Sequence, residues 1–431
     1  MRGRRQLIRA IGYTGIALVV LNSMIGAGIF ALPTVIAADA GTTSPWLFLV
    51  VGLLVITIVL TFAELASYFQ ESGGPVLYAQ TAFGPLTGFG TGWMLYISRV
   101  YAFAANANVI PLYLGSFWPW AAEAAGRAVL ITAVCAALTW ANYIGVRDGV
   151  RTVGILTVLK ISPLLLMILL GLPYVTPATL IPAELPPLDD LGGTTLLLIY
   201  AFVGFESATI ISGETRRPRI TMPRALVSTV IATGVLYFLV VLVFISVLPD
   251  ASGEGANLVD VGARLAGPAG AAVITLAAVF SVTGNLSAIM LAVPRLTFAL
   301  AENSLLPRWF GAVHARHATP GNSILFLGGL ALLLALSGTF EFLAAASSLT
   351  RLIAYGLCIA ALPLVRRHAA AGTRGEAYRL RGGYAVPLVA FALCVWIAAQ
   401  SALESWLLTA VLLAVGLALY YLARQRAPAG A

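Results

Sequence analysis

Charged residues are scarce in this chain. Only 10% of its 431 residues are charged and 60% are hydrophobic, and the mean hydropathy is +0.95. A soluble domain needs a polar surface that such a composition does not supply. The composition therefore excludes a soluble protein and predicts an all-α polytopic membrane protein, whose constant partner is the lipid bilayer.

Residues that bind metals or form disulfides are also few. The three cysteines all lie in apolar segments, and the three histidines lie in polar loops. Neither set has the spacing of a zinc site, and three buried thiols do not make a disulfide framework. We therefore expect no metal and no cofactor.

Long apolar runs make up most of the chain. Hydropathy predicts about twelve spans, with eleven or thirteen as the alternatives. We expect the third and eighth, which exceed the thickness of a bilayer, to tilt or to extend beyond it. The predicted spans lie near residues 14–38, 45–68, 86–117, 126–145, 151–172, 192–212, 223–248, 265–301, 321–338, 342–365, 384–401 and 404–423.

The loops between these spans alternate in charge. Arginines gather in alternate segments, at 2–9, 147–151, 216–224, 308–316, 366–381 and 424–426. We expect the protein in the cell (inner) membrane. By the positive-inside rule, both of its termini then lie in the cytoplasm. The net charge of +8 is then a topology signal and does not predict a nucleic-acid partner. The opposite loops carry Asp39, Glu123, Glu184, Asp189, Asp190, Asp250, Glu254, Asp260 and Glu341.

The first span is a poor continuous helix. It contains Gly26, Gly28 and Pro33, and glycine and proline both disfavour helix. Broken backbone at mid-membrane depth is tolerated where it is buried in protein or lines a cavity, so the interruption is a candidate binding site. A glycine face for helix packing is the alternative.

The sixth span repeats this pattern, with Gly204 two residues before Glu206. The sixth span lies five spans after the first, and an odd offset reverses the direction of the chain. The two halves, 14–172 and 192–365, are therefore predicted to be inverted repeats within one transporter domain, followed by two further spans in 384–423.

The chain resembles an amino acid permease of the amino acid–polyamine–organocation superfamily, in its sodium-independent branch. That family has the LeuT-like fold of five plus five inverted helices, with helices 1 and 6 broken. The resemblance rests on Ile25-Gly26-Ala27-Gly28-Ile29-Phe30 with Pro33, on Phe202-Val203-Gly204-Phe205-Glu206, on residues 213–226, and on residues 295–307.

The resemblance implies that substrate binds mainly to backbone at the two interruptions. An α-carboxylate would bind N–H groups near Gly26, Ala27, Gly28 and Ile29, and an α-ammonium would bind carbonyls near Ile25, Phe202 and Val203. Close approach of a ligand to backbone is what glycine permits, including at Gly204. Tyr200, Phe202 and Phe205 would cover the substrate, although ordinary packing is the alternative for each aromatic ring.

Lys160 is the single lysine of the chain and lies deep in the fifth span. An ammonium is a compact point charge, unlike the planar guanidinium of arginine. The resemblance implies that Lys160 replaces the sodium ion of sodium-coupled relatives, touching carbonyls near Asn22 or Ser23 and a hydroxyl such as Ser281. Snorkelling to the membrane surface is the alternative.

Three further charges lie inside spans. Glu206 is predicted to act as a gate, as a proton carrier or as a clamp on the sixth-span break. Arg99 shares a helical face with Phe103 and Asn106, and is expected to line the pathway or to pair with Glu206. Arg351 has a weaker signal.

Secondary active transport of amino acids by alternating access is the function that these features favour, by proton symport or by exchange. No nucleophile, paired aspartate or metal motif indicates an enzyme. The alternatives are a nutrient sensor with the same fold and a polyamine or organic-cation exchanger. The latter is disfavoured because Glu206 is the one carboxylate near the predicted pocket.

Overall fold

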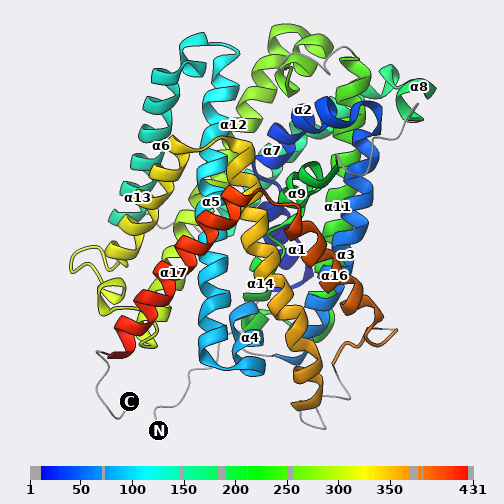
Figure 1. The fold of residues 1–431 in the computed structure, drawn as a ribbon. Helices are drawn as coiled ribbons and strands as arrows, with labels where there is room; N and C mark the ends of the chain where they lie inside the picture. Colours follow the sequence, from blue (N-terminus) through cyan, green and yellow to red (C-terminus); the bar gives the residue numbers. More distant parts are fainter. Residues whose placement is uncertain are drawn as a thin grey trace.

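The computed structural model describes residues 11–69, 73–145, 150–182, 191–210, 212–249, 256–368, 377–380 and 382–425. These residues form helices and connecting turns, without a β-strand in the described part (Figure 1). The helices are α1 (Tyr13–Met24), α2 (Gly28–Ala40), α3 (Ser44–Tyr68), α4 (Pro75–Phe83), α5 (Pro85–Gly115), α6 (Ala124–Ile144), α7 (Val150–Gly171), α8 (Pro177–Leu180), α9 (Leu191–Phe202), α10 (Glu206–Ile210), α11 (Pro218–Val247), α12 (Leu258–Glu302), α13 (Gly321–Ser337), α14 (Phe340–His368), α16 (Ala385–Ala399) and α17 (Leu403–Gln425).

The apolar helices match the predicted spans in order and position. Seven of the described helical runs are long and apolar enough to cross a membrane, and four shorter apolar helices accompany them. The first and sixth spans are each divided, into α1 and α2 and into α9 and α10. These findings confirm an all-α polytopic membrane protein with two broken helices.

Two local features differ from the predicted pattern. Helix α12 contains the eighth span and a short preceding helix, and the two are separated by non-helical backbone at Ala266 and Gly267, with φ of +63° at the glycine. The nine-residue helix α4 precedes the third span and was not expected. The third span is long as predicted, since α5 has 31 residues.

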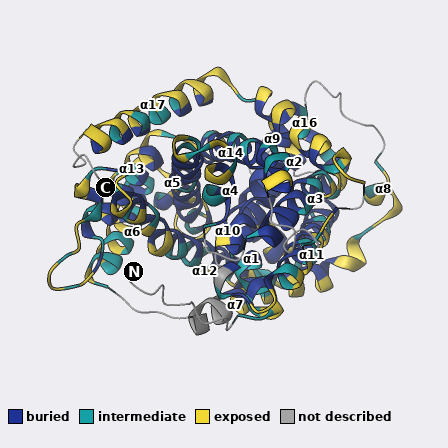
Figure 2. Ribbon diagram, turned by 90° about the horizontal axis from the view of Figure 1, so that it is seen from below, coloured by how far each residue is buried: buried dark blue, intermediate teal, exposed yellow. Residues whose placement is uncertain are grey.

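The broken helices lie in the interior of the bundle. Viewed along the bundle in Figure 2, α1, α9 and α10 are mostly buried and are surrounded by other helices, whereas α16 and α17 lie at the outside. Large apolar side chains are exposed on the outer helices, for example Leu388 and Leu403. An exposed apolar surface of this kind suits contact with lipid.

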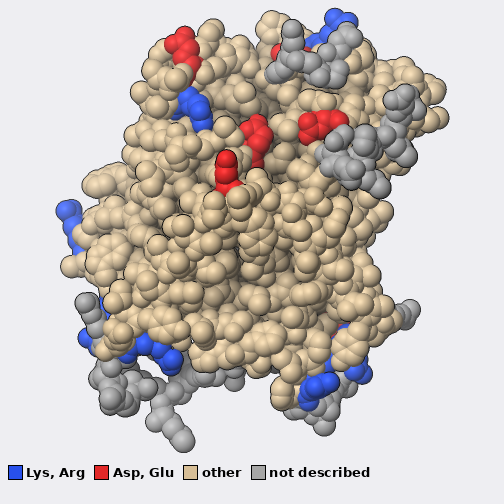
Figure 3. Space-filling model, viewed as in Figure 1, with Lys and Arg blue, Asp and Glu red and all other residues tan. Residues whose placement is uncertain are grey.

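Charged residues on the face in Figure 3 separate toward the two ends of the molecule. The carboxylates lie mostly toward the upper end, and lysine and arginine lie mostly toward the lower end, where α17 ends (Figures 1 and 3). Part of the predicted charge pattern, including positions 2–9, 147, 184, 189–190, 250, 254, 374, 381 and 426, falls outside the described residues.

Candidate functional site

The first break places the end of α1 and the start of α2 inside the bundle. Helix α1 ends at Met24, and Ile25 has extended backbone with φ of −80° and ψ of 91°. Helix α2 restarts at Gly28, and its first turn closes when Phe30 N–H donates to Ala27 O at 3.0 Å. The N–H groups at the start of a helix have no intrahelical partner, so Gly28 and Ile29 offer donors for an anion.

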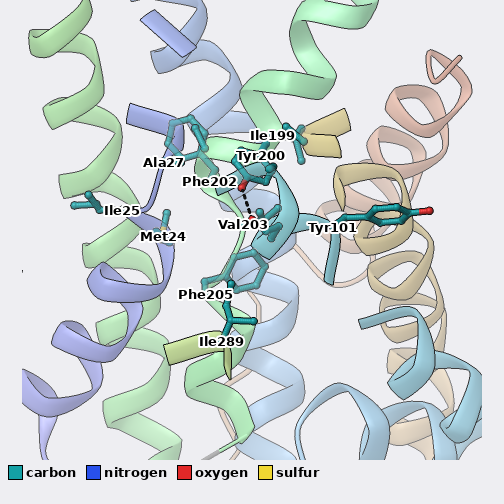
Figure 4. Packing of buried hydrophobic residues seen from close by; sticks show 14 of the residues in the cluster. Met24, Ile25, Ala27, Tyr101, Ile199, Tyr200, Phe202, Val203, Phe205 and Ile289 are labelled. Carbon is teal, nitrogen blue, oxygen red and sulfur yellow. Dashed lines mark hydrogen bonds between the residues drawn. The ribbon is translucent and has the colours of Figure 1, made fainter. Parts of the chain in front are cut away.

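The second break fits directly against the first. Gly204 has φ of +118°, a conformation that L side chains rarely adopt. A Cβ at this position would lie 2.6 Å from the carbonyl oxygen of Ser23. The backbone conformation at residue 204 and the close backbone of Ser23 therefore both require glycine. Figure 4 shows Met24, Ile25 and Ala27 beside Tyr200, Phe202 and Val203.

Glu206 holds the second break in place. Its Oε2 accepts from Gly204 N–H at 2.9 Å and from the Tyr355 hydroxyl at 2.6 Å. Its Oε1 accepts from Arg99 Nη2 at 2.9 Å and lies 3.6 Å from Nε of Arg351. Arg99 also contacts the hydroxyl of Ser207. The predicted pairing of Arg99 with Glu206 is thus present, and the contacts suit the clamp among the three roles considered for Glu206.

Lys160 binds the end of α1 from helix α7. Its Nζ donates to Ile25 O at 2.7 Å, to Asn22 Oδ1 at 2.8 Å and to Asn22 O at 3.2 Å. An ammonium has three donors, and each has an acceptor here. The side chain is 1% exposed, so it does not snorkel to a surface. The predicted contact of Lys160 with the hydroxyl of Ser281 is not among these three bonds, and that hydroxyl donates to the neighbouring Gly26 O at 3.4 Å.

A row of hydrogen bonds joins the breaks to the surrounding helices. The Tyr200 hydroxyl donates to Asn106 Oδ1 at 2.7 Å, and Asn106 Nδ2 donates to Asn285 Oδ1 at 2.8 Å. Asn285 Nδ2 then donates to Asn22 O at 3.4 Å, where Lys160 also binds. Five helices, α9, α5, α12, α1 and α7, contribute one residue each.

A small cavity of about 20 Å³ lies between the breaks, which is room for one or two water molecules. Eight of the predicted site residues line it, including Gly26, Gly28 and Val203. The full lining is Ser23, Met24, Gly26, Ala27, Gly28, Arg99, Ala102, Asn106, Tyr200, Val203, Asn285 and Arg351.

Several predicted site residues lie outside this lining. The ring of Phe202 packs against Tyr237 and Gly52, and the ring of Phe205 packs against Phe62 and Tyr355. Of the three predicted covering aromatics, Tyr200 alone lines the cavity. The side chains of Ile25, Ile29 and Phe103 are buried in the apolar core.

Sequence reasoning missed several residues with clear roles in this geometry. Asn285 lines the cavity, and Tyr355 binds the clamp. The Tyr237 hydroxyl lies 3.3 Å from Met24 O and 3.2 Å from Ala201 O, so its single O–H is shared between a carbonyl of each break. An uncharged polar residue in an apolar run carries no strong signal by itself. The spacing of Asn285 from Ser281, one helical turn, was the available clue.

The family of the chain follows from its match to known proteins. The family model described as amino acid permease matches residues 11–422, nearly the whole chain. The chain belongs to the amino acid permease family. This confirms the resemblance that the motifs indicated, and the two broken helices of this permease contain the motifs at residues 25–33 and 202–206.

Curated relatives of this permease align along nearly their full length. An uncharacterised transporter of Mycobacterium tuberculosis is 30% identical over 434 residues, which cover 96% of this chain and 91% of the relative. The branched-chain amino acid permease BcaP of Bacillus subtilis is 26% identical, with 97% and 94% covered. The methylthioribose transporter of the same organism is also 26% identical, with the same coverage.

Proposed function

We propose that this permease carries amino acids across the cell membrane by alternating access, with both termini in the cytoplasm, and that it is not an enzyme. The observation that carries the proposal is the contact between the two broken helices around a polar cavity. The start of α2 offers N–H groups to an α-carboxylate, and the carboxyl ends of α1 and α9 offer carbonyls to an α-ammonium. The relatives that are named as transporters support the same conclusion.

The substrate site of this proposal consists of backbone at Gly26, Ala27, Gly28 and Val203, with Tyr200 and Asn106 beside it. Residues 14–172 and 192–365 form the two inverted halves, and alternating access moves one set of helices against the other around this point. The cavity of about 20 Å³ is too small for an amino acid, so the helices must separate before substrate enters.

Transport is proposed to be independent of sodium. The ammonium of Lys160 fills a site of converging carbonyl oxygens, the type of environment that a sodium ion would need. Coupling then comes from protons or from exchange. A purified sensor with the same fold would bind substrate without moving it.

The test is uptake of radiolabelled amino acids into proteoliposomes. We expect uptake with an imposed proton gradient, or with amino acid loaded inside, and the same rate when choline replaces sodium. Binding without uptake would contradict transport and favour a sensor, and strong stimulation by sodium would contradict the role of Lys160.

A matched pair of variants ties uptake to the breaks. Gly28→Val adds methyl groups where a Cβ would already lie 3.4 Å from Cα of Ala201, and it is expected to abolish uptake. Gly329→Val places the same change in α13, where nothing lies within 4 Å of a Cβ, and it is expected to keep uptake. Equal uptake by the two variants would count against a substrate site at the first break.

A further inference from the structure

Two arginines of this permease face one carboxylate at the cavity. Arg99 and Arg351 both line the cavity between the breaks. Each of them forms an ion pair with the carboxylate of Glu206. The local charge of these three groups is +1. Charge left unbalanced in a buried site is costly, unless a further anion enters.

The carboxylate of Glu206 already accepts three hydrogen bonds. Gly204 N–H and the Tyr355 hydroxyl occupy Oε2, and Arg99 occupies Oε1 at 2.9 Å. The separation of 3.6 Å between Oε1 and Nε of Arg351 is an ion pair but longer than a hydrogen bond. Glu206 therefore leaves the donors of Arg351 without a hydrogen-bonding oxygen.

Arg351 has unused donors in the interior of the protein. Its Nε and Nη2 are buried and have no hydrogen-bond partner among the described residues, and the residue is 2% exposed. A buried guanidinium without hydrogen bonds is unusual, because almost all buried polar groups are paired. The planar fork of arginine matches a carboxylate, which it binds through two parallel hydrogen bonds.

We propose that Arg351, with Arg99 beside it, is a second anion subsite, and that the preferred substrates are amino acids with an acidic side chain. This inference rests on the proposed function. The α-carboxylate and α-ammonium bind at the breaks, and the side-chain carboxylate takes the free donors of Arg351. An aspartate or glutamate substrate carries a net charge of about −1 near neutral pH, which balances the local +1.

The same charges act against other substrates. A branched-chain side chain would cover Arg351 without supplying an acceptor, and a polyamine would bring positive charge to two arginines. We therefore do not expect this pocket to prefer the branched-chain amino acids for which one relative is named.

The experiment compares amino acids of one shape and different charge. Unlabelled glutamate, glutamine, aspartate, asparagine and leucine compete with radiolabelled glutamate for uptake into proteoliposomes. We expect glutamate and aspartate to compete at about tenfold lower concentration, or less, than their amides and leucine, as a charged hydrogen bond implies. Glutamine or leucine competing as well as glutamate would overturn the inference and leave amino acid transport standing. Failure of every amino acid to bind or to be taken up would instead overturn the proposed function.

Variants locate the effect at Arg351. Arg351→Gln is expected to weaken glutamate binding about tenfold or more and to change glutamine binding less than threefold, as measured by ligand-induced thermal shift. Arg308→Gln removes the same charge from an exposed position and is the control. A similar loss in both variants, or an unchanged preference in Arg351→Gln, would overturn the inference. If Arg351→Gln does not fold, Arg351→Lys tests the same point, because an ammonium keeps the charge but loses the fork.

Discussion

At the scale of single residues, the polar groups of this permease serve mainly to hold broken backbone in shape. Lys160 satisfies two carbonyls that the end of α1 leaves free, and Glu206 satisfies the N–H of Gly204. Each group replaces a hydrogen bond that a continuous helix would have supplied. The charges of Lys160 and Glu206 inside apolar runs are thus explained by the interruptions of the helices.

Replacing Lys160 should test this role directly. Lys160→Met removes three donors and leaves the acceptors of Asn22 and Ile25 buried, at a cost of about 1–3 kcal/mol for each unpaired group. We expect a clear fall in the melting temperature of the purified protein and weaker substrate binding. Lys160→Arg should recover only part of both, since a planar guanidinium does not fit a compact cation site. Full uptake by Lys160→Met would contradict this role.

Gly204 offers a second test at the residue scale. Gly204→Ala forces an L side chain into positive φ, which costs about 1–3 kcal/mol, and brings its Cβ against Ser23 O. We expect lower thermal stability and loss of uptake. Gly193→Ala in α9 is the control, because nothing lies within 4 Å of its Cβ and alanine favours helix. Equal melting temperatures for the two variants would show that the breaks do not need their close contact.

At the scale of helices, the sequence predicted the spans well because length and hydropathy are both set by the bilayer. The interruption at residues 25–27 was predicted from Gly26 and Gly28, and the one at 203–205 from Gly204. The short helix α4 was missed, because nine residues give too weak a periodic signal.

The site was predicted less completely than the spans. Charged residues inside apolar runs, such as Arg99 and Glu206, are conspicuous in the sequence, and the structure brings these two together. Asn285 and Tyr237 have ordinary neighbours along the chain, and their importance comes from contacts with distant helices. The orientation of Phe202 and Phe205 could not be deduced either, because a broken helix has no regular face.

The contact between helices at the two breaks depends on Tyr237 of α11. Its single O–H is shared between Met24 O at 3.3 Å and Ala201 O at 3.2 Å, so one side chain contacts both interrupted spans. Tyr237→Phe should cost about 1–3 kcal/mol, because it removes this donor from the buried Ala201 O, whereas Met24 O still accepts from Gly26 N–H at 3.0 Å. The measurement is the melting temperature of the purified variant.

Tyr96→Phe is the matched control for this substitution. The Tyr96 hydroxyl is buried and has no hydrogen-bond partner in the described part of the chain, so its removal should be close to neutral. A loss in Tyr96→Phe equal to that in Tyr237→Phe would show that the effect comes from packing and not from the carbonyls.

At the scale of the whole molecule, ion pairs and hydrogen bonds tie the helices together near both ends. Near one end, Glu64 of α3 binds Arg366 of α14 through two contacts of 2.8 Å and accepts from Leu380 N–H at 3.0 Å. Arg127 of α6 donates to Asn108 of α5 and to Gly338 O, which precedes α14. Both sets lie outside the cavity and hold helices that surround it.

The separation of charge also fixes an expected orientation in the membrane. The twelve predicted crossings, with each broken helix counted as one, would place the start of α1 and the end of α17 on the same side. Arginines gather toward that side, so the positive-inside rule puts it in the cytoplasm. A fluorescent protein that folds only in the cytoplasm, fused after residue 431, should therefore fluoresce. The same fusion after Thr339, between α13 and α14, should stay dark, whereas alkaline phosphatase at these two positions should give the opposite result. Fluorescence at both positions would contradict the three crossings predicted between them, by α14, α16 and α17.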